Sequence, residues 1–114
     1  MRRLIAILVL ASAPLVARAD DAAKTERLWK AKCASCHGVD GKGQTEQGKK
    51  MKMHDLSTAD WQKSFTDAQI KQVTLDGIDA QKEGVHKQMD PYKEKLKPDQ
   101  VDALTAFVRT LGSK

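Results

Sequence analysis

The stretch that decides the fold is Trp29-Lys30-Ala31-Lys32-Cys33-Ala34-Ser35-Cys36-His37, which holds both cysteines of the 114-residue chain. This pattern is open to four interpretations: a redox dithiol, a structural zinc site, a local disulfide and covalent haem attachment. A thioredoxin-like dithiol follows a strand, whereas a helical pattern precedes Cys33. A zinc site needs two further ligands at short spacing, and the other histidines, His54 and His86, are far apart. A local disulfide leaves His37 without a role.

The spacing favours c-type haem attachment. The thiols of Cys33 and Cys36 lie about one helical turn apart, so each can add to a vinyl group of one porphyrin. The histidine that follows is then held against the face of the ring, where its imidazole can bind iron. We therefore predict one covalently attached haem c per chain, tethered by Cys33 and Cys36, with His37 as the proximal iron ligand.

The first 19 residues resemble an export signal. Arg2 and Arg3 precede an apolar run, residues 4–17, and Ala17-Arg18-Ala19 offers small residues where signal peptidase reads them. The alternative is an uncleaved membrane anchor, but the run is shorter than the roughly 20 residues that span a bilayer. We expect a cleaved secretory signal peptide, residues 1–19, with cleavage after Ala19. The mature chain, residues 20–114, would then be a single periplasmic domain without stable membrane insertion.

The expected mature chain has few large apolar side chains. Leu, Ile, Val and Phe together number 15 of its 95 residues, a fraction typical of disordered chains. Its net charge, however, falls from +5 to +2 once the three leader arginines are removed, which is too low for a typical disordered chain. The length allows one small domain. Either this domain is disordered or something other than side chains supplies its core.

Periodicity predicts an all-α domain of three or four helices and two long loops. The first helix covers residues 21–36, and Gly- and Lys-rich residues 38–56 form a loop. Ser57 or Thr58 caps a short helix, and the Thr66/Gln69 capping box opens a helix that ends at Gly77. Residues 78–97 are predicted to be irregular, before a last helix that starts at Pro98. No sheet is expected, and loops this long suggest that they wrap a ligand.

A six-coordinate iron needs a second ligand from a distant part of the chain. The candidates are Met51, Met53, His54, His86 and Met89. We favour Met89, because its loop is held at both ends by helices and can cross the distal face of a haem. The other four stay open, as does an open coordination site. Thioether with imidazole favours reduced iron and gives a higher potential than two histidines.

The chain resembles a small class I cytochrome c of the monohaem bacterial type, from about residue 22 to residue 111. The resemblance rests on the Trp29–Gly38 stretch, on Asp40-Gly41-Lys42-Gly43, on Met89 with Tyr92 three residues later, and on Leu104–Arg109. It implies the cytochrome c fold around a covalent haem. It also implies that the first and last helices cross, with Trp29 packed against Leu104 and Phe107.

The sequence departs from the family pattern in places. Asp90 separates Met89 from the proline that commonly follows it, and Thr25 stands where a small glycine is usual at the helix crossing. Lys49-Lys50 follows Gly48 where a proline carbonyl often accepts from the histidine ring, so another carbonyl is expected to fix His37. Trp61 resembles a tryptophan that contacts a haem propionate, although a simple core role fits it equally.

We expect a soluble one-electron carrier, cycling Fe(III)/Fe(II) between redox partner proteins, and not an enzyme. The alternatives are a dedicated electron-transfer subunit of one periplasmic oxidoreductase and an open-site haem sensor or enzyme. A rim of lysines around the haem edge would steer acidic partners; its candidates are Lys42, Lys49, Lys50, Lys87 and Lys93. An ordinary solvated surface explains these lysines equally. Nucleic acid is not an expected partner, and the chain is expected to be a monomer.

Overall fold

The computed structural model describes residues 15–113, with side chains from residue 21 onward. Most of the expected leader, residues 1–14, lies outside the described residues. The first helix, α1, runs from Leu15 to Lys32 and so begins within the expected leader. Cleavage after Ala19 therefore stays a prediction. No helix in the described part of the chain is both long and apolar enough to cross a membrane.

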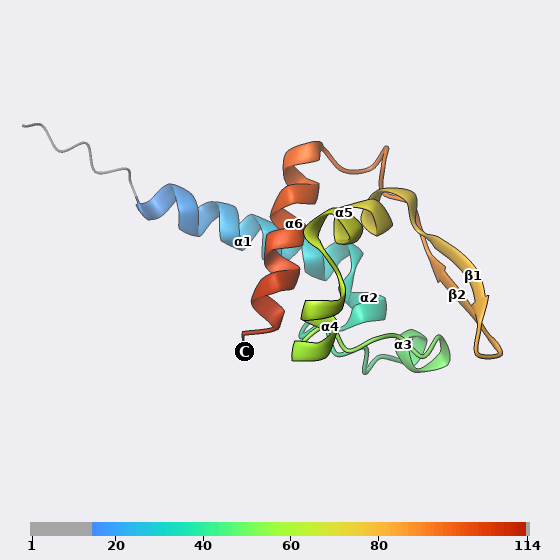
Figure 1. The fold of residues 1–114 in the computed structure, drawn as a ribbon. Coiled ribbons are helices and arrows are strands. Elements are labelled where there is room, and N and C mark those ends of the chain that lie inside the picture. Colours follow the sequence, from blue (N-terminus) through green and yellow to red (C-terminus); the bar gives the residue numbers. More distant parts are fainter. Residues whose placement is uncertain (1–14, 114) are drawn as a thin grey trace, which may run out of the picture.

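Six helices and one hairpin follow each other along residues 15–113 (Figure 1). After α1 come α2 (Ala34–His37), α3 (Glu46–Lys50), α4 (Ala59–Ser64) and α5 (Asp67–Asp76). Two strands, β1 (Ile78–Lys82) and β2 (Val85–Met89), precede α6 (Pro98–Leu111). Most of the predicted helix starts are confirmed. Thr58 caps α4, the Thr66/Gln69 capping box opens α5, and a proline occupies the first turn of α6.

Two predictions about the loops are wrong. Residues 78–97 do not form one irregular stretch, because β1 and β2 pair as an antiparallel hairpin with Ile78 opposite Met89. Glu83 and Gly84 both have positive φ, which is the geometry of a tight two-residue hairpin turn. The expected loop 38–56 contains α3, whose first turn is capped by the Thr45 side chain accepting from the Gly48 amide. The predicted first helix also breaks at Cys33, between α1 and α2.

The core lies where α6 crosses α1 and packs against α5 (Figure 1). The rings of Trp29 and Phe107 are 5.3 Å apart, and Leu104 belongs to the same buried cluster as Trp29. This confirms the predicted crossing of the first and last helices. The hairpin projects away from these helices on the other side of the molecule (Figure 1).

Arg109 of α6 ties α4 and α5 to this core. Its guanidinium donates to the Asp67 carboxylate at 2.8 Å and to the carbonyl oxygens of Gln62 and Phe65 at 2.8 and 2.6 Å. The Gln62 amide donates in turn to the Val108 carbonyl at 3.0 Å. Hydrogen bonds to a charged donor are stronger than neutral ones. This network fixes the α4–α5 junction, which carries two aromatic rings of the site described next.

Candidate haem site

The Cys33–His37 turn brings both thiols and the imidazole together at the end of α1. The Cys33 carbonyl accepts from the amides of Cys36 and His37, at 3.2 and 2.9 Å, so the chain turns once between the two cysteines. Both cysteines are half-buried and unpaired as thiols. Burial raises the pKa of the Cys33 thiol to about 11, since an apolar environment disfavours the thiolate. The chain thus makes one turn between the two thiols, as their spacing in the sequence predicts.

His37 lies against the core with its ring 5.7 Å from that of Trp29. Burial lowers its pKa, because desolvation disfavours the imidazolium. The neutral ring is the form that binds a metal. Its Nδ1 atom is buried and, among the described residues, has no hydrogen-bond partner. The backbone carbonyl expected to orient this ring is therefore not found, and the Thr45 hydroxyl donates instead to the neighbouring Cys36 carbonyl at 2.6 Å.

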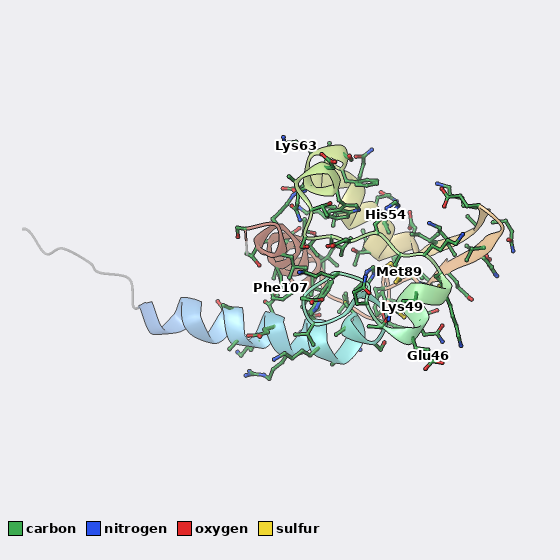
Figure 2. The ribbon with its side chains drawn as sticks, turned by 90° about the horizontal axis from the view of Figure 1, so that it is seen from below. Glu46, Lys49, His54, Lys63, Met89 and Phe107 are labelled. Carbon is green, nitrogen blue, oxygen red and sulfur yellow. The ribbon has the colours of Figure 1, made fainter. Side chains whose placement is uncertain are left out.

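A largely apolar cleft opens beside this turn, with an empty volume of about 1120 Å³ including its mouth. Cys33 and His37 line it from the α1–α2 turn, whereas Cys36 is not among its lining residues. Met89, which is labelled in Figure 2, lines it from the end of β2. Hydrophobic and aromatic side chains make up most of the remaining wall: Trp29, Leu56, Trp61, Phe65, Ile70, Val73, Ile78, Tyr92, Leu96, Leu104 and Val108. Such a cleft fits a large flat hydrophobic ligand with a few polar anchors.

Four of the five candidate distal ligands line this cleft, namely Met51, Met53, His54 and Met89. His86 is not among its lining residues; its Nε2 atom lies 2.5 Å from the Asp79 carboxylate across the hairpin. Met51 accepts at its sulfur from the Gln88 amide, 3.4 Å away, so this thioether is engaged with the strand that carries Met89. His86 therefore lies outside the cleft, whereas Met51 lines the cleft and its sulfur contacts β2.

Gly77 contacts the backbone of the Met89 segment, whereas the sequence predicts it only as the end of a helix. It has φ +72°, and a Cβ atom there would collide with the Met89 carbonyl oxygen and lie 2.8 Å from the Pro91 nitrogen. Gly77 therefore lets the end of α5 touch the backbone that carries Met89. The register Ile78↔Met89 holds the same two segments together. The only signal in the sequence is a glycine that precedes a strand.

Trp61 lines the cleft, but only one lysine of the predicted rim does. Trp61 lines the cleft from α4 and packs on Phe65, with ring centroids 5.2 Å apart, so the propionate and core roles both remain open. Of the five rim candidates, Lys87 alone lines the cleft, and its ammonium donates to the Lys52 carbonyl at 3.3 Å. Lys50 pairs with Glu46 on α3. The others are exposed on three different segments: Lys42, Lys49 and Lys93.

The donor set fits a haem better than a bare metal ion. The Cys33 thiol, the neutral His37 imidazole and the Met89 thioether line the apolar cleft, and the Cys36 thiol lies one turn away from Cys33. These are the groups that hold haem in c-type cytochromes. Among the described residues, no group of three or more His, Cys, Asp or Glu could hold a metal ion by itself, so the zinc interpretation finds no ligands there. Fold and site together are those of a class I c-type cytochrome.

Comparison with known proteins leads to the same class. Residues 22–112 match the family model described as "Cytochrome c", and the chain belongs to the cytochrome c family. Over 91 residues, or 80% of the chain, it is 35% identical to "Cbb3-type cytochrome c oxidase subunit FixP" of Azorhizobium caulinodans. The chain spans only about a quarter (27%) of that relative's length.

Two solved structures have the same fold. "KustC0563 c-type cytochrome" is 33% identical with a TM-score of 0.63, covering 76% of this chain and 95% of that one. A Tyr-to-Phe mutant of Kustc0563 is 32% identical with a TM-score of 0.62, covering 76% and 96%. The predicted cytochrome c fold is thereby confirmed, with the hairpin added to its helices. Membership of the cytochrome c family supports electron transfer and haem c as the cofactor.

Proposed function

We propose that this protein is a soluble periplasmic carrier of single electrons, with one haem c attached through Cys33 and Cys36. His37 and Met89 are the proposed axial ligands. Bound haem c supplies a reversible Fe(III)/Fe(II) couple. In this proposal side chains of the chain fill both axial positions, so no position is left for a substrate, and the protein is a carrier and not an enzyme.

The observation that carries the proposal is the convergence of Cys33, His37 and Met89 on one apolar cleft. The α1–α2 turn and the end of β2 are far apart in the sequence, yet both line it. The apolar wall excludes water from the bound group and limits the reorganisation that accompanies a change of charge. The chain thus contributes ligands and a largely apolar environment.

The axial assignment is tested by the absorption spectra of the oxidised and reduced protein. We expect covalent haem and, in the ferric form, a weak near-red sulfur-to-iron band that disappears in Met89→Ala. Met53→Leu is the matched control, because Met53 lines the same cleft and the substitution also removes one thioether. Loss of the band in Met53→Leu with retention in Met89→Ala would overturn the assignment. Rapid carbon monoxide binding by the ferrous wild-type protein would favour an open-site sensor or enzyme.

We propose that acidic partners dock at the lysines near the cleft, with Lys87 closest to the haem. Lys87 lines the cleft, and Lys49 lies on α3, whose following turn contacts β2 through Met51 and Gln88. With a net charge of only about +2 after removal of the leader, such encounters would be brief and sensitive to salt. Lys87→Glu should slow electron transfer to an acidic partner at low salt. Lys63→Glu on α4, which Figure 2 shows well away from Lys49, should change it less.

A second candidate function is suggested by the likeness to the FixP oxidase subunit. In that case the chain would serve one oxidoreductase in a stable complex. Gel filtration of the native protein from its own cells distinguishes the two: a monomer that reduces several partners supports the carrier, and constant co-elution with one oxidase supports the subunit. N-terminal sequencing of the same material tests the leader, with Asp20 expected as the first residue.

A further inference from the structure

One tyrosine joins the segment that follows Met89 to both α1 and α5. After β2 the chain passes through Asp90 and Pro91, and Tyr92 then turns back toward α1 and α5. Its hydroxyl donates to the carbonyl oxygen of Lys32 at 2.9 Å, and its amide donates to the Thr74 carbonyl at 3.0 Å. The hydroxyl contact joins residues that are 60 positions apart. Such a contact can fix where the Met89 segment lies.

The acceptor of this hydrogen bond occupies a special place. Lys32 is the last residue of α1 and directly precedes Cys33. Carbonyls in the last turn of a helix lack partners within the helix and carry partial negative charge, so a hydroxyl donor there is favourable. The Tyr92 hydroxyl therefore connects the Met89 segment to the residue that precedes the first haem cysteine.

The environment of Tyr92 keeps its hydroxyl in the form that donates. Its ring is half-buried, lines the cleft and packs against the core, and the Lys95 ammonium lies over the ring, 5.5 Å from its centroid. A phenol with the ordinary pKa of 10.0 is already protonated at neutral pH, and burial raises the pKa of Tyr92 further. An aromatic ring alone would fill the same space, but only a tyrosine supplies the donor.

We propose that Tyr92 is a positioning residue for Met89, whose hydroxyl holds the distal segment closed against the haem-attachment turn. The inference rests on the proposed function, since it takes Met89 as the distal ligand. Opening of the segment breaks the hydrogen bond to Lys32, so removing the hydroxyl favours the open form. A neutral hydrogen bond has a net effect of about 2- to 10-fold on such an equilibrium.

The test uses the haem-loaded chain and Tyr92→Phe, which removes only the hydroxyl. The first measurement is the rate at which added imidazole displaces the Met89 thioether from the ferric protein, expected to rise about 2- to 10-fold. The second is amide hydrogen exchange, in which the Tyr92 and Lys93 amides, bonded to α5 carbonyls, should exchange faster in the variant. The matched control is Thr105→Val, which also removes one hydroxyl bonded to a backbone carbonyl, but in the middle of α6.

Faster imidazole capture and faster exchange in Tyr92→Phe, with Thr105→Val unchanged in both, support the inference. Wild-type behaviour of Tyr92→Phe overturns it, and so does an equal increase in both variants, which would show only a general loss of stability. The Met89→Ala variant tests separately whether Met89 is the distal ligand, on which the inference rests. If Met89→Ala keeps the near-red band, the ligand assignment is wrong and the inference is wrong as well. If the band is lost while Tyr92→Phe behaves as wild type, only the inference fails.

Discussion

The indole nitrogen of Trp29 donates a hydrogen bond to the carbonyl oxygen of Gly38, 3.0 Å away, across the whole Cys33–His37 turn. The same ring lies 5.3 Å from that of Phe107 and is almost fully buried, at 3% exposure. One side chain therefore connects α1, the end of the haem-attachment turn and α6. The hydrogen bond holds the turn by its far end, because Gly38 directly follows His37.

Trp29→Phe should destabilise the haem-loaded protein by about 1–3 kcal/mol, because it leaves the Gly38 carbonyl without this donor and a gap beside Phe107. Chemical denaturation followed by circular dichroism measures the difference. The control is Trp61→Phe, whose indole is only half-buried and makes no side-chain hydrogen bond within residues 21–113. A Trp29→Phe variant that loses no more stability than Trp61→Phe would show that the bond to Gly38 contributes nothing.

Substitution of Gly77, which precedes the hairpin, and of Gly84, which lies in its turn, should distinguish the cost of backbone strain from the cost of a steric collision. Gly77 and Gly84 have nearly the same φ, +72° and +74°, but only Gly77 faces another backbone; nothing lies within 4 Å of a Cβ at Gly84. Gly84→Ala should cost about 1–2 kcal/mol, the penalty of the left-handed conformation. Gly77→Ala should cost at least about 3 kcal/mol, because the Met89 backbone must also move.

The near-red band provides the second measurement for this pair. Gly77→Ala should weaken or abolish it, since the displaced backbone belongs to the proposed ligand, and Gly84→Ala should leave it intact. Equal stability losses together with an unchanged band in both variants would contradict the close approach of Gly77 to Met89.

The sequence predicts the local turn of this site, which the structure shows, but not the contacts between distant segments. Cys33, Cys36 and His37 follow from spacing alone, because the chemistry needs them within one turn. Met89 is proposed as a ligand because of its position between two predicted helices, and not because of any adjacent residue. The contact between Gly77 and Met89, and that between Tyr92 and Lys32, depend on tertiary packing, and nothing in the flanking residues signals them.

The sequence does not predict the β1–β2 hairpin or α3, and both omissions have physical reasons. In β2 the half-buried positions are Val85, Lys87 and Met89, so a lysine interrupts the alternation of apolar residues that marks a strand. The hairpin turn is Glu83-Gly84, in which a glutamate adopts the left-handed conformation that asparagine or glycine usually takes. Helix α3 is only one turn long with Gly48 inside it, and such a helix is held by its cap and neighbours more than by propensity.

Asp55 provides a pH-dependent prediction. Its carboxylate accepts from the Ser57 amide at 2.9 Å and from the Ser57 hydroxyl at 2.5 Å. The side-chain hydrogen bond from Ser57 is the main cause that lowers the pKa of Asp55 below its ordinary value of 3.8. A carboxyl group whose pKa is lower in the folded than in the unfolded chain stabilises the fold at pH values above its unfolded pKa. This contribution is lost as the pH falls below about 4 and through the folded pKa.

Ser57→Ala should therefore raise the pKa of Asp55 toward its ordinary value and move the onset of acid unfolding to higher pH. Titration of the Asp55 carboxyl by NMR measures the first effect, and circular dichroism between about pH 2 and pH 6 the second. Ser64→Ala is the control, because the Ser64 hydroxyl donates to the Asp60 backbone carbonyl and touches no carboxylate. A pKa of Asp55 that is the same in both variants would contradict the proposed cause.

The last prediction concerns the core itself. Eight hydrophobic side chains are buried in the described residues, and six of them also line the cleft: Trp29, Leu56, Ile70, Leu96, Leu104 and Val108. Without haem, the inner surfaces of these side chains face a space that either stays empty or fills with water. Loss of that contact area costs several kcal/mol, comparable with the whole stability of a small domain.

The Cys33→Ser/Cys36→Ser chain should therefore be largely unfolded, with weak far-ultraviolet circular dichroism and no cooperative melting. The control is the wild-type sequence produced without its haem, which should be unfolded to the same extent and so exclude an effect of the serines. A compact, cooperatively melting form of either chain would mean that these side chains pack on one another, and that the haem is not the centre of the core.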